Sequence, residues 1–405
     1  MSGFFYRIDQ QINGGIISSM ANQYDLVIVG AGIHGAAVAR QAVDLGLNVC
    51  VLEQYSGPAR ATSSRSSKLI HGGLRYLETL SINLVRECLQ DRKRLLEHYP
   101  DLVHMQKFYI PIYKQTSRSR FVIRAGLSLY GLLGGLNKYS RYQVVPRSQW
   151  PHMDGIKQDD LLAVFQYWDA QTDDAKLTAR LLEESAERGA NIRYNARLSK
   201  ITQEPEGITA SIVDTQLNSQ SNADAPEESI KGRYLINAAG PWCNKVLEQC
   251  MPPQTGLPVE LVQGTHIELP GRLQHGVYYL ESPKDRRAIF AMPWYDRILF
   301  GTTETVYHGD PANVEPTAEE IDYLLQVYNH YFTQAPLTRD DIIDAWAGLR
   351  VLPKSEDDPF SRSRDTIFLC DNEEQPKIVS IFGGKLTSHF STAKKLLKKL
   401  NNNYG

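Results

Sequence analysis

Three glycines and one acid near the start of the chain have the types and spacing that bind a dinucleotide. Gly30, Gly32 and Gly35 follow the pattern G-x-G-x-x-G, and Glu53 comes roughly 20 positions later. Glycines at these places allow a tight turn, a close approach of a pyrophosphate to the backbone, and close packing of a helix on a strand. A carboxylate at Glu53 suits a ribose 2′-hydroxyl and would repel a 2′-phosphate. This pattern alone leaves FAD and NAD equally open.

The segments around these residues have the pattern needed to position them. An apolar run at 25–29 predicts a buried parallel strand, 33–45 a helix, and 48–52 a second strand that ends before Glu53. The N–H groups and the dipole at the start of that helix would face the phosphates. Strand, glycine turn, helix, strand and acid in this order are much stronger evidence than a glycine pattern alone.

Later segments predict a second set of elements. Short strands with alternating apolar residues are expected at 259–269, 277–280, 287–293 and 298–303, which is typical of an antiparallel sheet. We therefore predict a mixed α/β fold, with a Rossmann-like dinucleotide-binding domain and an interleaved antiparallel-sheet substrate domain. The predicted boundaries are an N-terminal extension at 1–23, a discontinuous binding domain at 24–105, 158–258 and 346–405, and a substrate domain at 106–157 and 259–345.

Length and composition limit the possible classes. A chain of 405 residues is long enough for two domains, and a net charge of −2 gives no overall attraction to nucleic acid. Five scattered cysteines without a C-x-x-C pair favour free thiols in a reducing cytosol, with no zinc or other metal site expected. No apolar run is long enough to cross a bilayer. Polar residues interrupt positions 1–23, so we expect a loose extension, with Met20 an alternative start, and no signal peptide.

Several motifs in order make the pattern specific. The chain contains GAGIHG, SSKLIHGGLRYL, INAAGPW, QGTH, GTTE, AGLRVLP and FGGKLT. With these motifs it closely resembles the FAD-dependent, membrane-associated glycerol-3-phosphate dehydrogenases, which belong to the D-amino-acid-oxidase-like flavoprotein superfamily. The resemblance covers 24 to about 400. It is the resemblance, and not the glycine spacing, that selects FAD.

The resemblance also implies which residues hold FAD. They form four groups along the chain: Gly30, Gly32, Gly35 and Glu53 at the ADP half; Thr62, Ser63, Ser67, Leu69, Gly72 and Gly73 at the pyrophosphate and flavin; Ala239 and Gly240 at the adenine end; Gly383, Gly384, Lys385 and Leu386 where a helix expected at 386–400 would begin against the flavin. The dipole of that helix would stabilise negative charge on the reduced ring.

The implied substrate is glycerol 3-phosphate, oxidised at C2 to dihydroxyacetone phosphate by hydride transfer to N5 of FAD. A phosphate dianion taken from water needs several charge-assisted hydrogen bonds, each contributing roughly 1.5–3 kcal/mol. The family pattern points to Arg75, Arg350, Arg364 and Lys385, with Tyr76 nearby. Arg364 lies in the plain context SRSRD, away from the glycine turns that flank the other three.

The hydroxyl proton requires a base, and a histidine is the usual one near neutral pH. His71 in HGGLR and His266 in QGTH are both candidates, and the sequence does not rank them. Each could instead anchor a turn. Arg350 would orient the alcohol electrostatically.

Two departures from the family pattern bear on these expectations. GGKLT continues into Thr-Tyr-Arg in the family but into Ser388, His389 and Phe390 here, so the rim of the site would lose a cation. Bacterial relatives continue into a helical C-terminal domain beyond the point where this sequence stops at Gly405, which leaves the oligomeric state open. An alternative function is therefore a related FAD-dependent oxidase or dehydrogenase of a 2-hydroxy acid or an amino acid, since an arginine pair binds carboxylate as well as phosphate.

The segment 118–141 is apolar with basic flanks, RSRFVIRAGLSLYGLLGGLNKYSR. This composition suits a peripheral contact with an anionic membrane surface. A helix packed against its own domain is an equally good interpretation. By the resemblance, a quinone would receive the electrons, and the protein would be cytoplasmic and peripheral on the cytoplasmic face of the inner membrane. A non-catalytic flavin-binding scaffold is a further alternative, which turnover would exclude.

Overall fold

The predicted nucleotide-binding unit is the centre of the first of two sheets. This computed structural model describes residues 23–78, 80–135, 137–216, 228–354 and 365–401. β1 (Gln23–Val29) lies between β2 (Val49–Leu52) and β10 (Glu228–Asn237) and is parallel to both. α1 (Ile33–Asp44) connects β1 to β2. The strand, helix and strand expected at 25–52 are thus confirmed.

The first sheet extends from this unit on both sides. Among the described residues its order is β11-β8-β9-β10-β1-β2-β7, with β19 also pairing with β10 and β18 with β19. The remaining strands are β7 (Asn191–Arg193), β8 (Ala196–Glu204), β9 (Gly207–Asp214), β11 (Cys250–Met251), β18 (Ile367–Cys370) and β19 (Ile378–Phe382). α1, α4 (Asp174–Glu187) and α7 (His389–Asn401) pack together against this sheet, and α5 (Cys243–Glu248) is in a separate core cluster.

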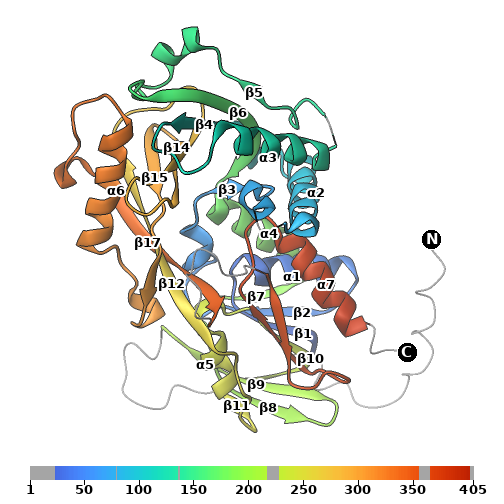
Figure 1. The fold of residues 1–405 in the computed structure, drawn as a ribbon. Coiled ribbons are helices and arrows are strands. Elements are labelled where there is room, and N and C mark those ends of the chain that lie inside the picture. The colour runs from blue at the N-terminus through green and yellow to red at the C-terminus, as the bar shows by residue number, and fades with distance from the viewer. Residues whose placement is uncertain (1–22, 79, 136, 217–227, 355–364, 402–405) are drawn as a thin grey trace.

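The second sheet is largely antiparallel. Its order is β16-β12-β15-β14-β13-β4-β6-β3, and β17 pairs with β12 and β5 with β6. The strands are β3 (Leu69–Ile70), β4 (Val103–Tyr113), β5 (Gln143–Val144), β6 (Leu161–Thr172), β12 (Val259–Leu269), β13 (Val277–Glu281), β14 (Ala288–Trp294), β15 (Arg297–Gly301), β16 (Thr305–Tyr307) and β17 (Asp344–Pro353). Figure 1 shows β4, β6, β14 and β15 at the top of the molecule and β1, β2, β8, β9 and β10 at the bottom.

Three helices belong to the second sheet and its surroundings: α2 (Ile82–His98), α3 (Arg120–Leu133) and α6 (Ala318–Tyr331). α6 contributes Leu324, Tyr328 and other side chains to the core of this sheet. A capping box formed by Thr317 and Glu320 begins α6. The short 3₁₀ segments are η2 (Thr62–Ser64), η3 (Leu74–Leu77), η4 (Arg147–His152), η6 (Gly240–Trp242), η7 (Pro311–Asn313) and η8 (Arg339–Asp341).

Besides the short β3, which lies within 24–105 but pairs with β6, sheet membership differs from the predicted domain boundaries at two long strands. β6 lies within the predicted binding segment 158–258, yet it pairs with β4 along its whole length. β17 lies mostly within 346–405 but pairs with β12 from Val259 to Glu268. An apolar strand pattern shows that a strand exists, while its partner depends on contacts far away in the sequence. The division into two interleaved domains therefore stays a proposal, with these two strands moved to the second sheet.

Candidate active site

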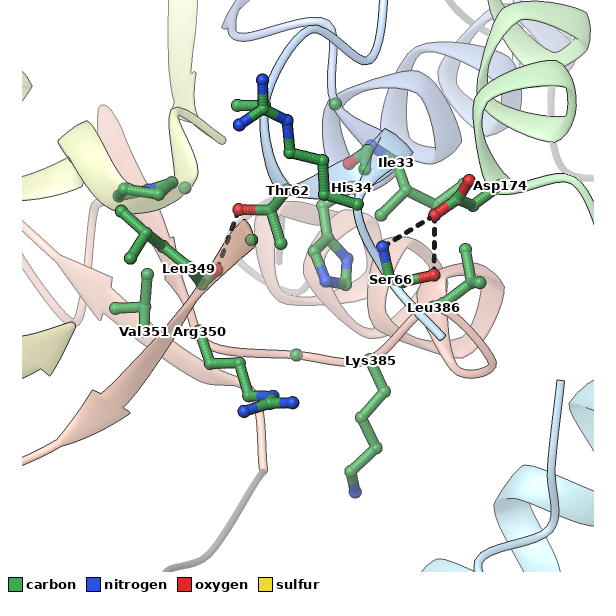
Figure 2. Close-up of a pocket in the computed structure, with 18 of the residues that line it drawn as sticks. Ile33, His34, Thr62, Ser66, Asp174, Leu349, Arg350, Val351, Lys385 and Leu386 are labelled. Atoms are coloured by element: carbon green, nitrogen blue, oxygen red, sulfur yellow. Dashed lines mark hydrogen bonds between the residues drawn. The ribbon is translucent and has the colours of Figure 1, made fainter. Parts of the chain in front are cut away.

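A cavity of about 700 Å³ is lined by residues of both sheets and of the loops between them. Its lining includes the glycine turn after β1 and Glu53 from the first sheet, and the aromatic side chains of Phe108, Tyr167 and Phe290 from the second. Figure 2 shows part of this pocket, with Arg350 of β17 and Lys385 of the loop after β19 extending in the same direction. A cavity of this volume, lined by both sheets, can hold a large cofactor together with a small substrate.

The glycine turn has the geometry that its sequence predicts. Gly30 has a φ of +105°, and a Cβ on Gly35 would lie 2.0 Å from the Gly30 carbonyl oxygen. Only glycine therefore lets α1 approach β1 this closely. Gly30 and Gly32 line the cavity, whereas Gly35 lies behind them and acts on packing. At the start of α1, the Ile33 N–H donates to Ser63 Oγ at 2.9 Å.

Glu53 occupies the end of β2 with its carboxylate fixed by the backbone. Ala31 N–H donates to Oε2 at 2.8 Å and Tyr55 N–H to Oε1 at 3.0 Å. Burial raises the pKa of Glu53, while these two N–H groups oppose the rise. The two N–H groups thus hold the side chain in place, and Glu53 lines the cavity together with the glycine turn.

The segment after β2, which is rich in small and hydroxyl side chains, runs along the cavity. Thr62 Oγ1 donates to the Leu349 carbonyl at 2.8 Å, and Ser66 donates to Asp174 through both its N–H and its hydroxyl (Figure 2). Thr62, Ser63, Ser67, Leu69 and Gly73 line the cavity; Gly72 does not. Ala239 and Gly240 line it near the glycine turn, where a Cβ on Gly30 would lie 2.7 Å from the Ala238 carbonyl oxygen.

The loop after β19 differs from the prediction. Gly383 and Gly384 have φ of +72° and +96°, and both line the cavity together with Lys385 and Leu386. The helix expected from Leu386 begins only at His389, because His389 Nδ1 lies 2.5 Å from the Leu386 carbonyl and stabilises a turn before the helix. The helix thus begins three residues later than predicted, and a glycine turn with Lys385 and Leu386 lines the cavity before it.

The altered residues after GGKLT lie away from the cavity. The lining includes Thr387, whereas His389 is fully buried and Phe390 packs near the Arg94 guanidinium, 5.9 Å from its carbon to the ring centre. Neither side chain is part of the described cavity wall. The departure from the family pattern therefore falls behind the site and not on its rim.

Three of the four predicted cations meet in the cavity: Arg75, Arg350 and Lys385 all line it, as does Tyr76. Lys385 Nζ lies 4.6 Å from the centre of the Tyr76 ring and 3.9 Å from Asp365 Oδ1. Arg350 lies 3.3–3.5 Å from acceptors of three successive residues, Thr302, Thr303 and Glu304. Arg364, the fourth predicted cation, falls outside the described residues.

Both candidate histidines line the cavity as well. His266 is 1% exposed, stacks on Trp346 at 5.8 Å, and has Nε2 2.9 Å from Ser67 Oγ. Burial, with Arg350 and Lys68 nearby, lowers the pKa of His266 well below its usual value, so the ring is neutral at physiological pH. Its Nδ1 has no hydrogen-bond partner among the described residues. The backbone N–H of His71 donates to Thr387 Oγ1 at 3.1 Å.

Other residues of the cavity wall were missed. Arg287 lines it and donates from Nη1 to the Glu304 carbonyl at 2.6 Å, and Glu304 itself is the acidic end of the GTTE motif. Tyr279 and Phe290 line the same region. The GTTE motif marks Glu304 in the sequence as a possible site residue. Arg287 begins an ordinary predicted strand, and no motif marks it. His34 was also missed; burial and His389 lower its pKa to about 4.

The residues present fit a dinucleotide cofactor with a bulky ring system. Neither the glycine turn nor the Gly383–Gly384 loop has room for a side chain. A Cβ on Gly384, for example, would lie 2.2 Å from His34 Nε2. The buried Glu53 and the three cations line the same cavity. No cluster of metal-binding side chains occurs among the described residues.

Comparison with known proteins gives the same cofactor. Residues 25–390 match the model of the FAD dependent oxidoreductase family. The chain belongs to this family. FAD is thus the cofactor of this oxidoreductase, and the mixed α/β fold agrees with the prediction. A helix long and apolar enough to cross a membrane is absent from the described residues.

Its relatives narrow the family further. A glycerol-3-phosphate dehydrogenase of Pseudomonas aeruginosa is 36% identical over 386 residues, which cover 94% of this chain and 72% of the relative. A D-erythritol 1-phosphate dehydrogenase of Brucella abortus is 35% identical, covering 93% and 73%. The aerobic glycerol-3-phosphate dehydrogenase of Escherichia coli is 34% identical, with the same coverage. The flavoprotein described here thus belongs with the glycerol-3-phosphate dehydrogenases, as its motifs predicted.

Solved structures share the fold. The glycerol-3-phosphate dehydrogenase of Bacillus halodurans, complexed with FAD, superposes with a TM-score of 0.71 at 24% identity; the match covers 94% of this chain and 65% of that one. L-alpha-glycerophosphate oxidase of Mycoplasma pneumoniae gives 0.74 at 16% identity, covering 94% and 95%. At these identities the likeness concerns the fold alone.

Proposed function

We propose that this flavoprotein oxidises sn-glycerol 3-phosphate to dihydroxyacetone phosphate. The observation that carries the proposal is the meeting of Arg75, Arg350 and Lys385 in the same cavity as two histidines. The names of the relatives support it, since three of them are dehydrogenases of a polyol phosphate. When bound, FAD would accept a hydride from C2 of the alcohol at its N5.

The residues of the chain divide the remaining work. Arg75 and Lys385 bind the phosphate, because charge-assisted hydrogen bonds offset the cost of taking the dianion from water. Tyr76 lies under the Lys385 ammonium and restricts its position. Arg350 orients the C2 hydroxyl from β17. The cofactor is held by the glycine turn, Glu53, the segment from Thr62 to Gly73, Ala239 and Gly240, and the loop from Gly383 to Leu386.

His71 and His266 are both proposed as acceptors of the hydroxyl proton. His266 is neutral and has an unpartnered ring nitrogen, so it has the capacity to accept. His71 belongs to the same loop as Arg75 and would lie close to the bound phosphate. Replacing the true base by asparagine should lower kcat about 10²–10⁴-fold, while the other replacement should act mainly on KM.

We further propose a quinone as electron acceptor and a peripheral contact of α3 with the cytoplasmic face of the inner membrane. α3 buries Ile123, Leu127 and Tyr130 but leaves Phe121 68%, Val122 55% and Leu132 59% exposed. The buried face of α3 thus supports packing against its own domain, and the exposed face supports the membrane contact. Exposed apolar side chains among basic residues suit an anionic bilayer surface.

D-erythritol 1-phosphate is a second candidate substrate, favoured by a relative of that name that is as similar as the others. An anaerobic titration of the purified holoenzyme separates the candidates. Bleaching of the flavin absorbance by sn-glycerol 3-phosphate at lower concentration than by D-erythritol 1-phosphate supports the first proposal, and the reverse order supports the second. Bleaching only by a 2-hydroxy acid or an amino acid would overturn both. Reoxidation of the bleached enzyme by a soluble quinone against air then tests the acceptor.

A further inference from the structure

The backbone N–H of Gly72, in the loop that carries His71, Arg75 and Tyr76, is bound by a tyrosine from a distant helix. Gly72 N–H lies 2.8 Å from the Tyr130 hydroxyl and 3.1 Å from Asp169 Oδ1. Tyr130 comes from α3 and Asp169 from β6. The Tyr130 hydroxyl in turn lies 2.8 Å and 3.0 Å from the two carboxylate oxygens of Asp169. Gly72 is therefore held by two groups that also hold each other.

This cluster is buried and electrically balanced. Asp169 is 1% exposed and forms an ion pair with Arg92 of α2, which also donates to the Trp168 carbonyl at 3.1 Å. Burial and the Asp169 carboxylate raise the pKa of Tyr130 well above its usual value, so its hydroxyl stays protonated and donates to Asp169. The hydroxyl oxygen remains available to accept from Gly72 N–H.

The contact requires glycine on the loop. A Cβ on Gly72 would lie 2.3 Å from the Tyr130 hydroxyl and 2.5 Å from Leu89 Cδ2. The loop is thus pressed against α2 and α3, which pack against each other and against η3. Gly72 does not line the cavity, so the FAD role expected for it from the motif has no support in the geometry.

The anchored loop carries the groups that face the substrate. His71 precedes Gly72, and Arg75 and Tyr76 follow within η3. The His71 N–H is fixed from the other side by Thr387 of the GGKLT loop. Two successive backbone N–H groups are thus bound to separate parts of the fold. A shift of Gly72 would move His71 and Arg75 together.

We infer that Tyr130 is a positioning residue that sets the place of His71 and Arg75 through the Gly72 N–H. The inference rests on the proposed function, since it assigns these two side chains to the substrate. Tyr130 does not touch the substrate itself. Its hydroxyl acts indirectly, by fixing the backbone of the loop that carries the phosphate-binding Arg75.

The test compares Tyr130→Phe with Tyr99→Phe in the holoenzyme. Tyr99 is also buried and its hydroxyl lies 3.2 Å from the Glu184 carboxylate, but it does not line the cavity or contact the loop. Both variants lose a tyrosine–carboxylate contact, and Tyr130→Phe also removes an acceptor for the Gly72 N–H, so both should lower Tm, with the larger loss for Tyr130→Phe. Only Tyr130→Phe should raise KM for sn-glycerol 3-phosphate, by about five- to thirty-fold, with a smaller change in kcat. A KM within about two-fold of the wild type would overturn the inference.

A measurement on the wild type keeps the inference testable if Tyr130→Phe does not fold. Hydrogen exchange of the peptide that contains 70–77 should show a strongly protected amide in the holoenzyme. Exchange of every amide in this peptide as fast as in an exposed loop would also overturn the anchoring. If the wild type fails to oxidise sn-glycerol 3-phosphate but the amide is protected, the proposed substrate is wrong while the anchoring stands.

Discussion

The Lys385 ammonium lies 4.6 Å from the centre of the Tyr76 ring, inside the cavity that contains Arg75 and Arg350. The side chain of Lys385 is only 10% exposed, so its charge is largely removed from bulk water. A cation over an aromatic face is held in place without losing its capacity to donate to an anion. This arrangement suits a lysine that binds a phosphate entering the cavity.

Replacing Lys385 by methionine should therefore weaken substrate binding. The loss of one charge-assisted hydrogen bond of about 1.5–3 kcal/mol predicts a rise in KM for sn-glycerol 3-phosphate of about ten- to hundred-fold. Steady-state kinetics with the holoenzyme measure it. Lys395→Met is the matched control, because Lys395 is 58% exposed on α7 and pairs with Glu87. Equal KM values for both variants would argue against a phosphate site at Lys385.

The glycine loop after β19 yields a second prediction. Gly384→Ala places a Cβ 2.2 Å from His34 Nε2 in addition to a strained φ of +96°. We expect this clash to displace the loop into the cavity and lower the FAD content of the purified protein. Gly46→Ala is the control: its φ is +78°, but no atom lies within 4 Å of the added Cβ. Both variants should lose about 1 kcal/mol of unfolding free energy from the strain alone.

The ratio of flavin to protein absorbance after purification reports the result. Gly384→Ala should bind FAD substoichiometrically and recover part of it when FAD is added, whereas Gly46→Ala should match the wild type. Full FAD content in both variants would show that His34 moves aside and that the loop tolerates a side chain.

The sequence was sufficient where the information is local. The strand, turn and helix at 25–45 depend on an apolar run and on glycine spacing, so they were predicted almost to the residue. Motif resemblance added Arg75, Arg350 and Lys385, which the fold brings together from three separate segments.

Long-range features were harder to predict. The pairing of β6 with β4 and of β17 with β12 depends on registers between distant segments, which an alternating pattern does not encode. The contact of Tyr130 with Gly72 is hidden for the same reason, since the composition of 118–141 shows only an apolar segment with basic flanks. The start of α7 was placed three residues early, because Leu386, Thr387 and Ser388 form a turn that a helix-compatible composition does not exclude.

His389 predicts a loss of stability in acid. Its ring is fully buried, and burial lowers its pKa to about 4, against about 6.5 in the unfolded chain. The unfolded state therefore binds more protons below about pH 6.5, so stability falls as the pH drops from there toward 4. Between about pH 7 and about pH 5 this one group should lower the unfolding free energy by about 2 kcal/mol.

Urea unfolding of the holoenzyme at both pH values measures this loss. His389→Gln should reduce the pH dependence by about that amount, although it also alters the turn that His389 Nδ1 forms with Leu386. His308→Gln, the same substitution at an exposed histidine, is the matched control. The same pH dependence in all three proteins would show that His389 does not titrate differently in the folded state.

The exposed face of α3 gives the last prediction. If Phe121 enters the interface of an anionic bilayer, Phe121→Ser should weaken sedimentation with anionic liposomes about ten-fold or more, since burial of a phenylalanine side chain contributes about 1.5–3 kcal/mol. Binding should also fall as salt is added, because Arg120 and Arg124 share the exposed side of this helix. Tyr295→Ser is the control, at an aromatic residue that is also 68% exposed but lies between β14 and β15. Equal losses in both variants, or no binding by the wild type at low salt, would mean that α3 serves only the internal packing that holds Tyr130 over Gly72.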